Sequence, residues 1–221
     1  DLRLYRQYRQ RLREFRPDLY LSFTVKPNIY GSLAAAQLGI PAIPNISGLG
    51  TSFIHRGWIT RLVSALYRVA LRRSGVVFFQ NPQDRRLFVS ETLVTPAQAW
   101  LVPGSGVDLA YFQPGRAAAP PPRPRDAEGC VHFALIARML RDKGVEEFVE
   151  AARQLHASGA RARFFLVGPA GVNNRSAIPL EKLAAWEAEG ILTYRGEQRQ
   201  IRDEIARYDC LVLPSYREGM A

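Results

Sequence analysis

The sequence has little cysteine, histidine or lysine, and it has no long apolar run. The 2 cysteines, Cys130 and Cys210, cannot form the disulfide framework of a small secreted domain. This scarcity favours a reducing compartment, so we expect a cytoplasmic protein. No stretch of about 18 consecutive apolar residues occurs, so the sequence predicts no transmembrane helix.

The overall composition is that of a folded chain. Hydrophobic residues make up 47 % and charged residues 23 % of the 221 positions, which excludes a wholly disordered protein. The length suits one large domain or two small ones, each with its own core. The chain opens at Asp1 without an initiator methionine and ends soon after an apolar run, so we interpret it as a central fragment.

Positive charge is concentrated in the first half. The formal net charge is +10, and residues 1–104 hold 14 basic and 5 acidic residues against 16 and 15 in residues 105–221. Almost all basic residues are arginines, since Lys26, Lys143 and Lys182 are the only lysines. A basic half predicts an anionic partner, such as nucleic acid, a membrane surface or a phosphorylated substrate. A generally basic proteome is the alternative explanation.

Expected strands and helices alternate along the chain. In the first half we expect strands at 19–24, 41–47, 76–80 and 101–102, and helices at 2–16, 28–38, 58–73 and from 81 onwards. In the second half we expect strands at 131–137, 163–167, 191–194 and 210–213, and helices at 145–158, 180–189 and 201–208. This pattern predicts an α/β protein with two Rossmann-like parallel β/α domains. Residues 113–129 are rich in proline and predict a semi-rigid linker between domains at 1–112 and 130–221.

Polar and glycine residues follow several expected strands. In open parallel sheets, ligands bind beyond the carboxyl ends of the strands. Arg138 and then Lys143, at a helix start, suit a diphosphate, although both could be ordinary surface residues. Gly168 would let a ligand approach the backbone, and Glu218 could accept hydrogen bonds from ligand hydroxyls, although a lone loop glutamate is usually only solvated. Together these strand ends indicate a nucleotide sugar.

The segments that contain these residues resemble the retaining GT-B glycosyltransferases of family 4, also called glycosyl transferases group 1. The resemblance rests on five segments in the family's order: 78–84, 102–108, 136–144, 165–168 and 208–219. It covers nearly the whole chain. It implies a GT-B fold in which both domains are incomplete: an acceptor-side domain lacking its first β/α units, and a donor domain truncated at its C-terminus.

The resemblance also implies residue roles. Arg138 and Lys143 would neutralise the donor diphosphate as the leaving group departs, and Glu218 would bind hydroxyls of the donor sugar. Nucleotide-binding roles fall to Gly168, Gly196, Glu197, Gln198, Ser215 and Gly219. We expect no metal site and no cofactor, because the family generally needs none and the 3 histidines are scattered. A UDP-sugar would be a substrate.

The acceptor side carries the excess positive charge. Segments 46–53 and 104–108 resemble family members that act on polyprenyl-diphosphate-linked sugars, and the candidate acceptor residues are Lys26, Gly48, Gly50 and Ser105. Lys26 could contact an acceptor phosphate or be a surface lysine. The expected helix at 58–73 has a wide apolar arc bordered by Arg56, Arg61, Arg68 and Arg72. This pattern suits an anionic membrane surface, and a helix packed between the sheet and a neighbour is the alternative.

We therefore predict retaining transfer of a hexose or N-acetylhexosamine from a UDP-sugar to a lipid-linked or glycan acceptor. The expected pathway is bacterial cell-surface polysaccharide or lipopolysaccharide biosynthesis, with the enzyme peripheral on the inner face of the cytoplasmic membrane. We expect the fragment alone to be inactive, because the family's second motif glutamate and its N-terminal glycine-rich loop lie outside it.

Two alternatives remain open at this stage. A Rossmann-type enzyme of another class, such as a dehydrogenase, would need a glycine fingerprint that no strand here precedes. A basic nucleic-acid-binding module is supported by charge alone, because the Phe and Tyr residues lie mostly at the spacing of strand or helix cores. We therefore expect no nucleic-acid partner.

Overall fold

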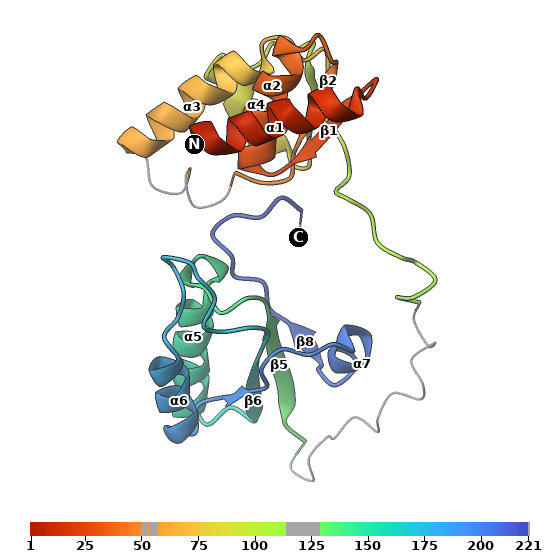
Figure 1. Cartoon of the computed structure of the whole chain (residues 1–221). Coiled ribbons are helices and arrows are strands. Elements are labelled where there is room, and N and C mark those ends of the chain that lie inside the picture. Colours follow the sequence, from red (N-terminus) through yellow and green to blue (C-terminus); the bar gives the residue numbers. More distant parts are fainter. Residues whose placement is uncertain (50–52, 54–56, 114–128, 221) are drawn as a thin grey trace. The chain divides into compact units, whose positions relative to one another are not determined.

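The computed structural model describes residues 1–49, 53, 57–113 and 129–220. The chain forms two compact units: Asp1–Gly106 together with the residues from Arg217 onwards, and Val107–Tyr216. Each unit contains a parallel sheet with four strands among the described residues, flanked by helices (Figure 1). Most of the predicted linker at 113–129 lies outside the described residues. The predicted domain limits remain a prediction, and the residues from Arg217 onwards pack with the first unit.

The sheet of the first unit has the strand order β1-β2-β3-β4. Its strands are β1 (Tyr20–Phe23), β2 (Ala42–Ile46), β3 (Val77–Phe79) and β4 (Ala99–Leu101). Tyr20 lies opposite Ala42, and Phe79 lies opposite Leu101. β4 begins and ends earlier than the strand expected at 101–102. Because all four strands run in parallel, the loops that follow them meet at one edge of the sheet.

Among the described residues, five helical segments accompany this sheet: α1 (Leu2–Phe15), the π-helical turn η1 (Pro27–Gly31), α2 (Ser32–Gln37), α3 (Trp58–Leu71) and α4 (Pro82–Ser90). The helix expected at 28–38 is thus a π-helical turn followed by a short α-helix. Asn28 explains the irregular start, because its buried side chain accepts a hydrogen bond from Ser22 Oγ (2.7 Å) and donates one to Asn45 O (2.8 Å). These bonds tie the turn to β1 and β2.

Aromatic rings form the centre of the first core. The Phe88 ring on α4 lies 5.1 Å from Tyr67 on α3 and 5.2 Å from Phe79 on β3, measured between ring centroids. All three side chains are buried. The other face of the sheet carries apolar side chains that stay exposed, among them Leu21, Phe23 and Trp100. The helices therefore cover the face to which Phe79 belongs.

The second unit has the strand order β7-β6-β5-β8. Its strands are β5 (Val131–Ile136), β6 (Ala162–Val167), β7 (Thr193–Tyr194) and β8 (Cys210–Leu211), and its helices are the 3₁₀ turn η3 (Arg141–Lys143), α5 (Val145–Ala157), α6 (Leu180–Ala188) and α7 (Ile201–Ile205). α5 and α6 pack on one face of the sheet (Figure 1). Tyr208, three residues after α7, packs on the other face with Ala134 and Val167.

Two strands of this unit are half as long as predicted. The strands expected at 191–194 and 210–213 are reduced to β7 and β8. Ile191 and Leu192 join the core cluster of Trp186 instead of the sheet, and Ile191 N donates to Trp186 O (3.3 Å) at the end of α6. Their apolar character therefore reflects burial in a helix-to-strand connection.

Candidate functional site

The end of β5 leads into a helix start with two cationic side chains. Arg138 is exposed, and Lys143 is half-buried at the end of η3, directly before Gly144. Gly144 is the N-cap residue of the 13-residue helix α5, whose first backbone N–H groups have no partner within the helix. Such a helix start attracts anions through its free N–H groups and its dipole. The structure thus places Arg138 and Lys143 in the connection that leads to this helix start, and their role at a diphosphate stays a prediction.

The acidic residues in the first turn of α5 have partners of their own. Glu146 pairs with Lys182 and lies 3.7 Å from Arg141 Nε, and Glu147 accepts a hydrogen bond from Tyr216 Oη. Their negative charge is therefore engaged beside the N-terminus of α5. The same hydrogen bond with Glu147 raises the pKa of the Tyr216 hydroxyl above its ordinary value.

Gly168 and Gly196 meet at the carboxyl edge of the same sheet. Gly168 N donates to Gly196 O at 2.8 Å, and Tyr194 Oη donates to Gly168 O at 2.8 Å. A Cβ atom on Gly168 would lie 2.0 Å from Ala137 O, so only glycine fits there. Gln198 Nε2 donates to Arg195 O at 2.6 Å, which folds the loop after Gly196 back on itself.

Ser215 lies on a segment that packs on the start of α5. Tyr216 N donates to Asp142 O at 3.1 Å, and a Cβ atom on Gly144 would lie 2.4 Å from Pro214 O. The segment that contains Ser215 therefore lies next to the turn that contains Lys143. Gly168 and Gly196 are joined directly by a hydrogen bond. Glu197 is exposed on the loop that follows Gly196.

A buried carboxylate, that of Glu204, supports the loop that begins at Gly196. This residue was not identified from the sequence. Glu204 is 4 % exposed, and its carboxylate accepts from Arg195 Nε at 3.1 Å and from Tyr208 Oη, with Arg207 Nε at 3.2 Å. Burial alone would raise the pKa of Glu204, but hydrogen bonds from Tyr208 and Arg195 and the nearby positive charges lower it below its ordinary value. The spacing of Glu204, Arg207 and Tyr208 along one face of the helix expected at 201–208 is a sequence signal for this cluster, although α7 ends at Ile205.

The candidate acceptor residues occupy the carboxyl edge of the first sheet. Gly48 follows β2, and Ser105 follows β4 and accepts a hydrogen bond from Gln80 Nε2 at 2.7 Å. Gly219 packs against Ser47 and Gly48. Lys26 follows β1, and its Nζ lies 3.4 Å from Asp1 Oδ2 on the exposed surface, so it pairs with the start of α1. Gly50 and Arg56 lie outside the described residues.

Glu218 and Gly219 belong to the first unit, whereas Arg138, Lys143, Gly168, Gly196, Glu197, Gln198 and Ser215 belong to the second. The Glu218 side chain is half-buried, and its backbone carbonyl accepts from Asn81 Nδ2 at 3.3 Å. The preceding residue, Arg217, pairs with Asp84 on α4. Sequence reasoning missed Arg217 and Asp84, although both stand in segments that carried the family resemblance.

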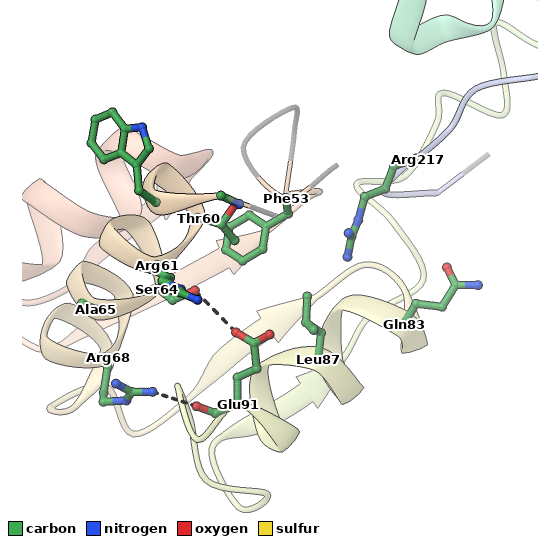
Figure 2. A pocket seen from close by; sticks show the side chains of 12 residues that line it. Phe53, Thr60, Arg61, Ser64, Ala65, Arg68, Gln83, Leu87, Glu91 and Arg217 are labelled. Atoms are coloured by element: carbon green, nitrogen blue, oxygen red, sulfur yellow. Dashed lines mark hydrogen bonds between the residues drawn. The ribbon is translucent and has the colours of Figure 1, made fainter. Parts of the chain in front are cut away.

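A pocket of about 800 Å³ lies between α3 and α4 of the first unit (Figure 2). Ser64 Oγ lies 3.5 Å from Glu91 Oε2, and Arg68 Nη2 donates to Glu91 O at 2.9 Å, so two α3 side chains bond the end of α4. Arg61 lies on the α3 side of the pocket, and Gln83 and Arg217 lie on the other side (Figure 2). The sequence did not predict this pocket.

Two features are absent from the described part of the chain. Within those residues, no group of three or more His, Cys, Asp or Glu side chains could hold a metal ion. None of the described helices has the length and apolar character needed to cross a bilayer. The expectation of a metal-independent site stays a prediction.

Two parallel β/α units with candidate ligand residues at their carboxyl edges define a GT-B protein. Residues 1–105 match the family described as "Glycosyl transferase 4-like domain", and residues 131–221 match "Glycosyl transferases group 1". The chain therefore belongs to the family 4 glycosyltransferases, and the predictions of family and fold class are confirmed. This membership decides between a glycosyltransferase and the other classes that the sequence had left open.

A curated relative supports this assignment. The chain is 28 % identical over 217 residues to N,N'-diacetylbacillosaminyl-diphospho-undecaprenol alpha-1,3-N-acetylgalactosaminyltransferase of Campylobacter jejuni subsp. jejuni. The alignment covers 94 % of this chain and 55 % of the relative. The chain thus spans about half the length of this protein.

Solved structures show the same fold. HepE from Anabaena, solved in complex with UDP-glucose, matches with a TM-score of 0.75 and 16 % identity, over 96 % of this chain and 56 % of that one. The trehalose 6-phosphate synthase of Burkholderia multivorans matches with a TM-score of 0.74 and 18 % identity, over 99 % and 56 % of the two chains. These likenesses concern the fold.

Proposed function

We propose that the protein transfers a hexose or N-acetylhexosamine from a UDP-sugar to a polyprenyl-diphosphate-linked or other glycan acceptor, with retention of configuration. The observation that carries this proposal is the helix start after β5, where Arg138, Lys143 and the N-terminus of α5 follow one strand end. Membership of the family and the UDP-glucose complex of HepE support a nucleotide-sugar donor. The named acceptor of the Campylobacter relative supports a lipid diphosphate acceptor.

The donor end of the reaction needs positive charge at the leaving group. When the bond between the sugar C1 and the phosphate oxygen breaks, negative charge builds on the diphosphate. Arg138, Lys143 and the N–H groups of α5 would stabilise that charge more strongly than they stabilise the ground state. The acceptor hydroxyl would attack C1 from the same face and give its proton to the departing phosphate, which leaves the configuration unchanged. Glu218 would bind hydroxyl groups of the donor sugar.

The first unit would bind the acceptor and meet the membrane. Its edge carries Gly48, Ser105 and Lys26, the candidate contacts for the acceptor. α3 buries Tyr67 and Leu71 and leaves a stripe exposed that contains Trp58, Leu62 and Val69. Arginines flank this stripe, a pattern suited to the surface of an anionic bilayer. On this proposal the protein is cytoplasmic and peripheral, and takes part in cell-surface polysaccharide or lipopolysaccharide biosynthesis.

A transfer assay tests the proposal directly. The full-length protein is incubated with each of UDP-glucose, UDP-N-acetylglucosamine and UDP-N-acetylgalactosamine, together with polyprenyl-diphosphate-linked sugars, and the product linkage is read by NMR. We expect one donor to give an α-linked product with an axial anomeric bond like that of the donor. Release of free sugar without transfer, or a product of inverted configuration, would contradict it.

A further inference from the structure

Asp84 holds the segment that carries Glu218. Arg217 Nε lies 3.1 Å from Asp84 Oδ1, and the Arg217 Nη2 group bonds the same oxygen. We propose that Asp84 is a positioning residue: through Arg217 it fixes where Glu218 presents its side chain. The inference rests on the donor-binding role proposed for Glu218 and adds a residue and a contact to it.

The burial of this ion pair makes it a demanding contact. The Asp84 side chain is 1 % exposed and that of Arg217 is 25 % exposed. A carboxylate so deep in the fold costs free energy unless it is paired and hydrogen-bonded. Asp84 meets this need with Arg217 on one oxygen and with Asn81 Nδ2, at 2.9 Å, on the other. Without Arg217, Asp84 would lose the cationic partner that it has among the described residues.

Asn81 links the same carboxylate to the backbone of Glu218. Its Oδ1 accepts from Asp84 N at 2.7 Å, which caps the start of α4, and its Nδ2 is shared between Asp84 and Glu218 O. A helix cap alone would need only the first of these bonds. Residues 81–84 therefore hold two consecutive residues of the distant segment: Asn81 bonds the backbone of Glu218, and Asp84 pairs with Arg217.

The residues after Glu218 fit closely against the first unit. A Cβ atom on Gly219 would lie 1.8 Å from Ser47 O, and one on Gly104 would lie 2.9 Å from Met220 Sδ. The chain therefore lies against the loops after β2 and β4 on either side of Asn81. The close contacts at Gly219 and Gly104 determine where the backbone of residues 219–220 runs. The Asp84–Arg217 ion pair determines how far along this course Glu218 is placed. Loss of the pair should therefore shift Glu218 without unfolding the unit.

A cycle of variants in the full-length protein tests this role. Asp84→Asn keeps the size of the side chain and removes its charge, Arg217→Gln removes the other partner, and the double variant removes both. If Asp84 acts through Arg217, each single variant should lower kcat at least tenfold, and the double variant should be no slower than the slower single one. Binding of UDP alone should change less than twofold, because all of its proposed contacts except Gly219 lie in the second unit.

Hydrogen exchange gives a readout that does not need catalysis. Asp84→Asn should speed amide exchange in residues 217–220 at least tenfold, while residues 81–90 stay protected. Arg85→Gln is the matched control, because Arg85 is also on α4 but donates to Ala99 O of β4 (2.8 Å) instead of contacting the segment of Glu218. It should leave both exchange in 217–220 and kcat unchanged.

The outcomes separate the two proposals. Unchanged exchange in 217–220, or additive losses in the variant cycle, would overturn the role of Asp84. If Asp84→Asn does not fold, Arg217→Gln carries the exchange test alone, since Arg217 lies nearer the surface. A different pair of results would uphold the anchoring by Asp84 but reject the donor-binding role of Glu218: faster exchange in Asp84→Asn, together with full activity in a Glu218→Gln variant.

Discussion

Arg195 Nε donates to Glu204 Oε1 at 3.1 Å and so joins the end of β7 to α7. Arg195 directly precedes Gly196, whose carbonyl accepts from Gly168 N. The buried carboxylate therefore supports the loop that carries Gly196, Glu197 and Gln198, the residues proposed to contact the nucleotide. The pKa of Glu204 is lowered in the folded protein, so the stability of the fold should depend on pH through this residue.

Glu204→Gln should destabilise the fold in a pH-dependent way. A carboxyl whose pKa is lower in the folded than in the unfolded state stabilises the fold above the unfolded value, about 4.3 for glutamate. That contribution is lost as the pH falls through the lower folded pKa. We expect a loss of about 1–3 kcal/mol at pH 7 that narrows steadily below about pH 4.

Urea unfolding at several pH values measures this difference. Glu189→Gln is the control, because Glu189 is an exposed surface partner of Arg153 and should change stability by less than about 1 kcal/mol. A Glu204→Gln deficit that stays constant from pH 7 to acid would show that the charge of Glu204 does not stabilise the fold.

Lys143→Ala and Arg138→Ala should each lower kcat/KM about 100-fold or more, since each removes a charge beside the leaving diphosphate. Arg141→Ala is the matched control: Arg141 lies in the same turn, but it is exposed and pairs with Glu146. Steady-state kinetics of the full-length protein with saturating acceptor provide the measurement. Equal losses in Arg141→Ala and Lys143→Ala would indicate a general charge effect rather than a phosphate contact.

Gly168→Ala should weaken UDP binding at least tenfold. The new Cβ would lie 2.0 Å from Ala137 O, so the ends of β5 and β6 must separate and the Gly168–Gly196 bond is strained. Isothermal titration with UDP measures the change. Gly75→Ala, where a Cβ meets nothing within 4 Å, should bind UDP like the wild-type protein. A Gly168→Ala protein that folds and binds UDP normally would remove Gly168 from the proposed nucleotide site.

Replacing the exposed α3 stripe should release the protein from membranes. Trp58 is 74 % exposed and Leu62 is 51 % exposed, so Trp58→Ser with Leu62→Ser removes apolar contact without opening the core. We expect the bound fraction on anionic vesicles to fall several-fold, and the wild-type fraction to fall with added salt. Leu180→Ser, which replaces a residue 56 % exposed on α6, is the control. Equal sedimentation of all three proteins would reject α3 as the contact.

Hydrophobic periodicity was sufficient to predict both sheets and most helices. The alternation of apolar strands and amphipathic helices survives in every unit of the fold, because burial on a parallel sheet imposes it. Boundaries failed where burial has another source. Ile191 and Leu192 look like strand residues, yet they fill the core under Trp186.

The sequence predicts those candidate site residues that lie near the end of a strand in the same stretch of chain. Gly168 stands directly after β6, and Arg138 and Lys143 lie in the connection between β5 and α5, so topology alone brings them to one edge. Asp84 and Arg217 pair across 133 residues, and nothing in either local sequence marks the partner. Asn81 and Asp84 look like an ordinary helix cap, which they also form. Contacts of this range become visible only when the fold is known.

The basic surface of the first unit consists almost entirely of arginine. Five arginines of α1 and its C-terminal end are exposed, namely Arg3, Arg6, Arg11, Arg13 and Arg16, and Arg61 and Arg72 add to them at α3. A guanidinium keeps its proton at every pH at which proteins fold, and lysine acetylation cannot neutralise it. In the proposed membrane contact, acylation of lysine therefore cannot weaken the binding of this surface to anions. Ionic strength and the composition of the opposing surface are the variables left to control it.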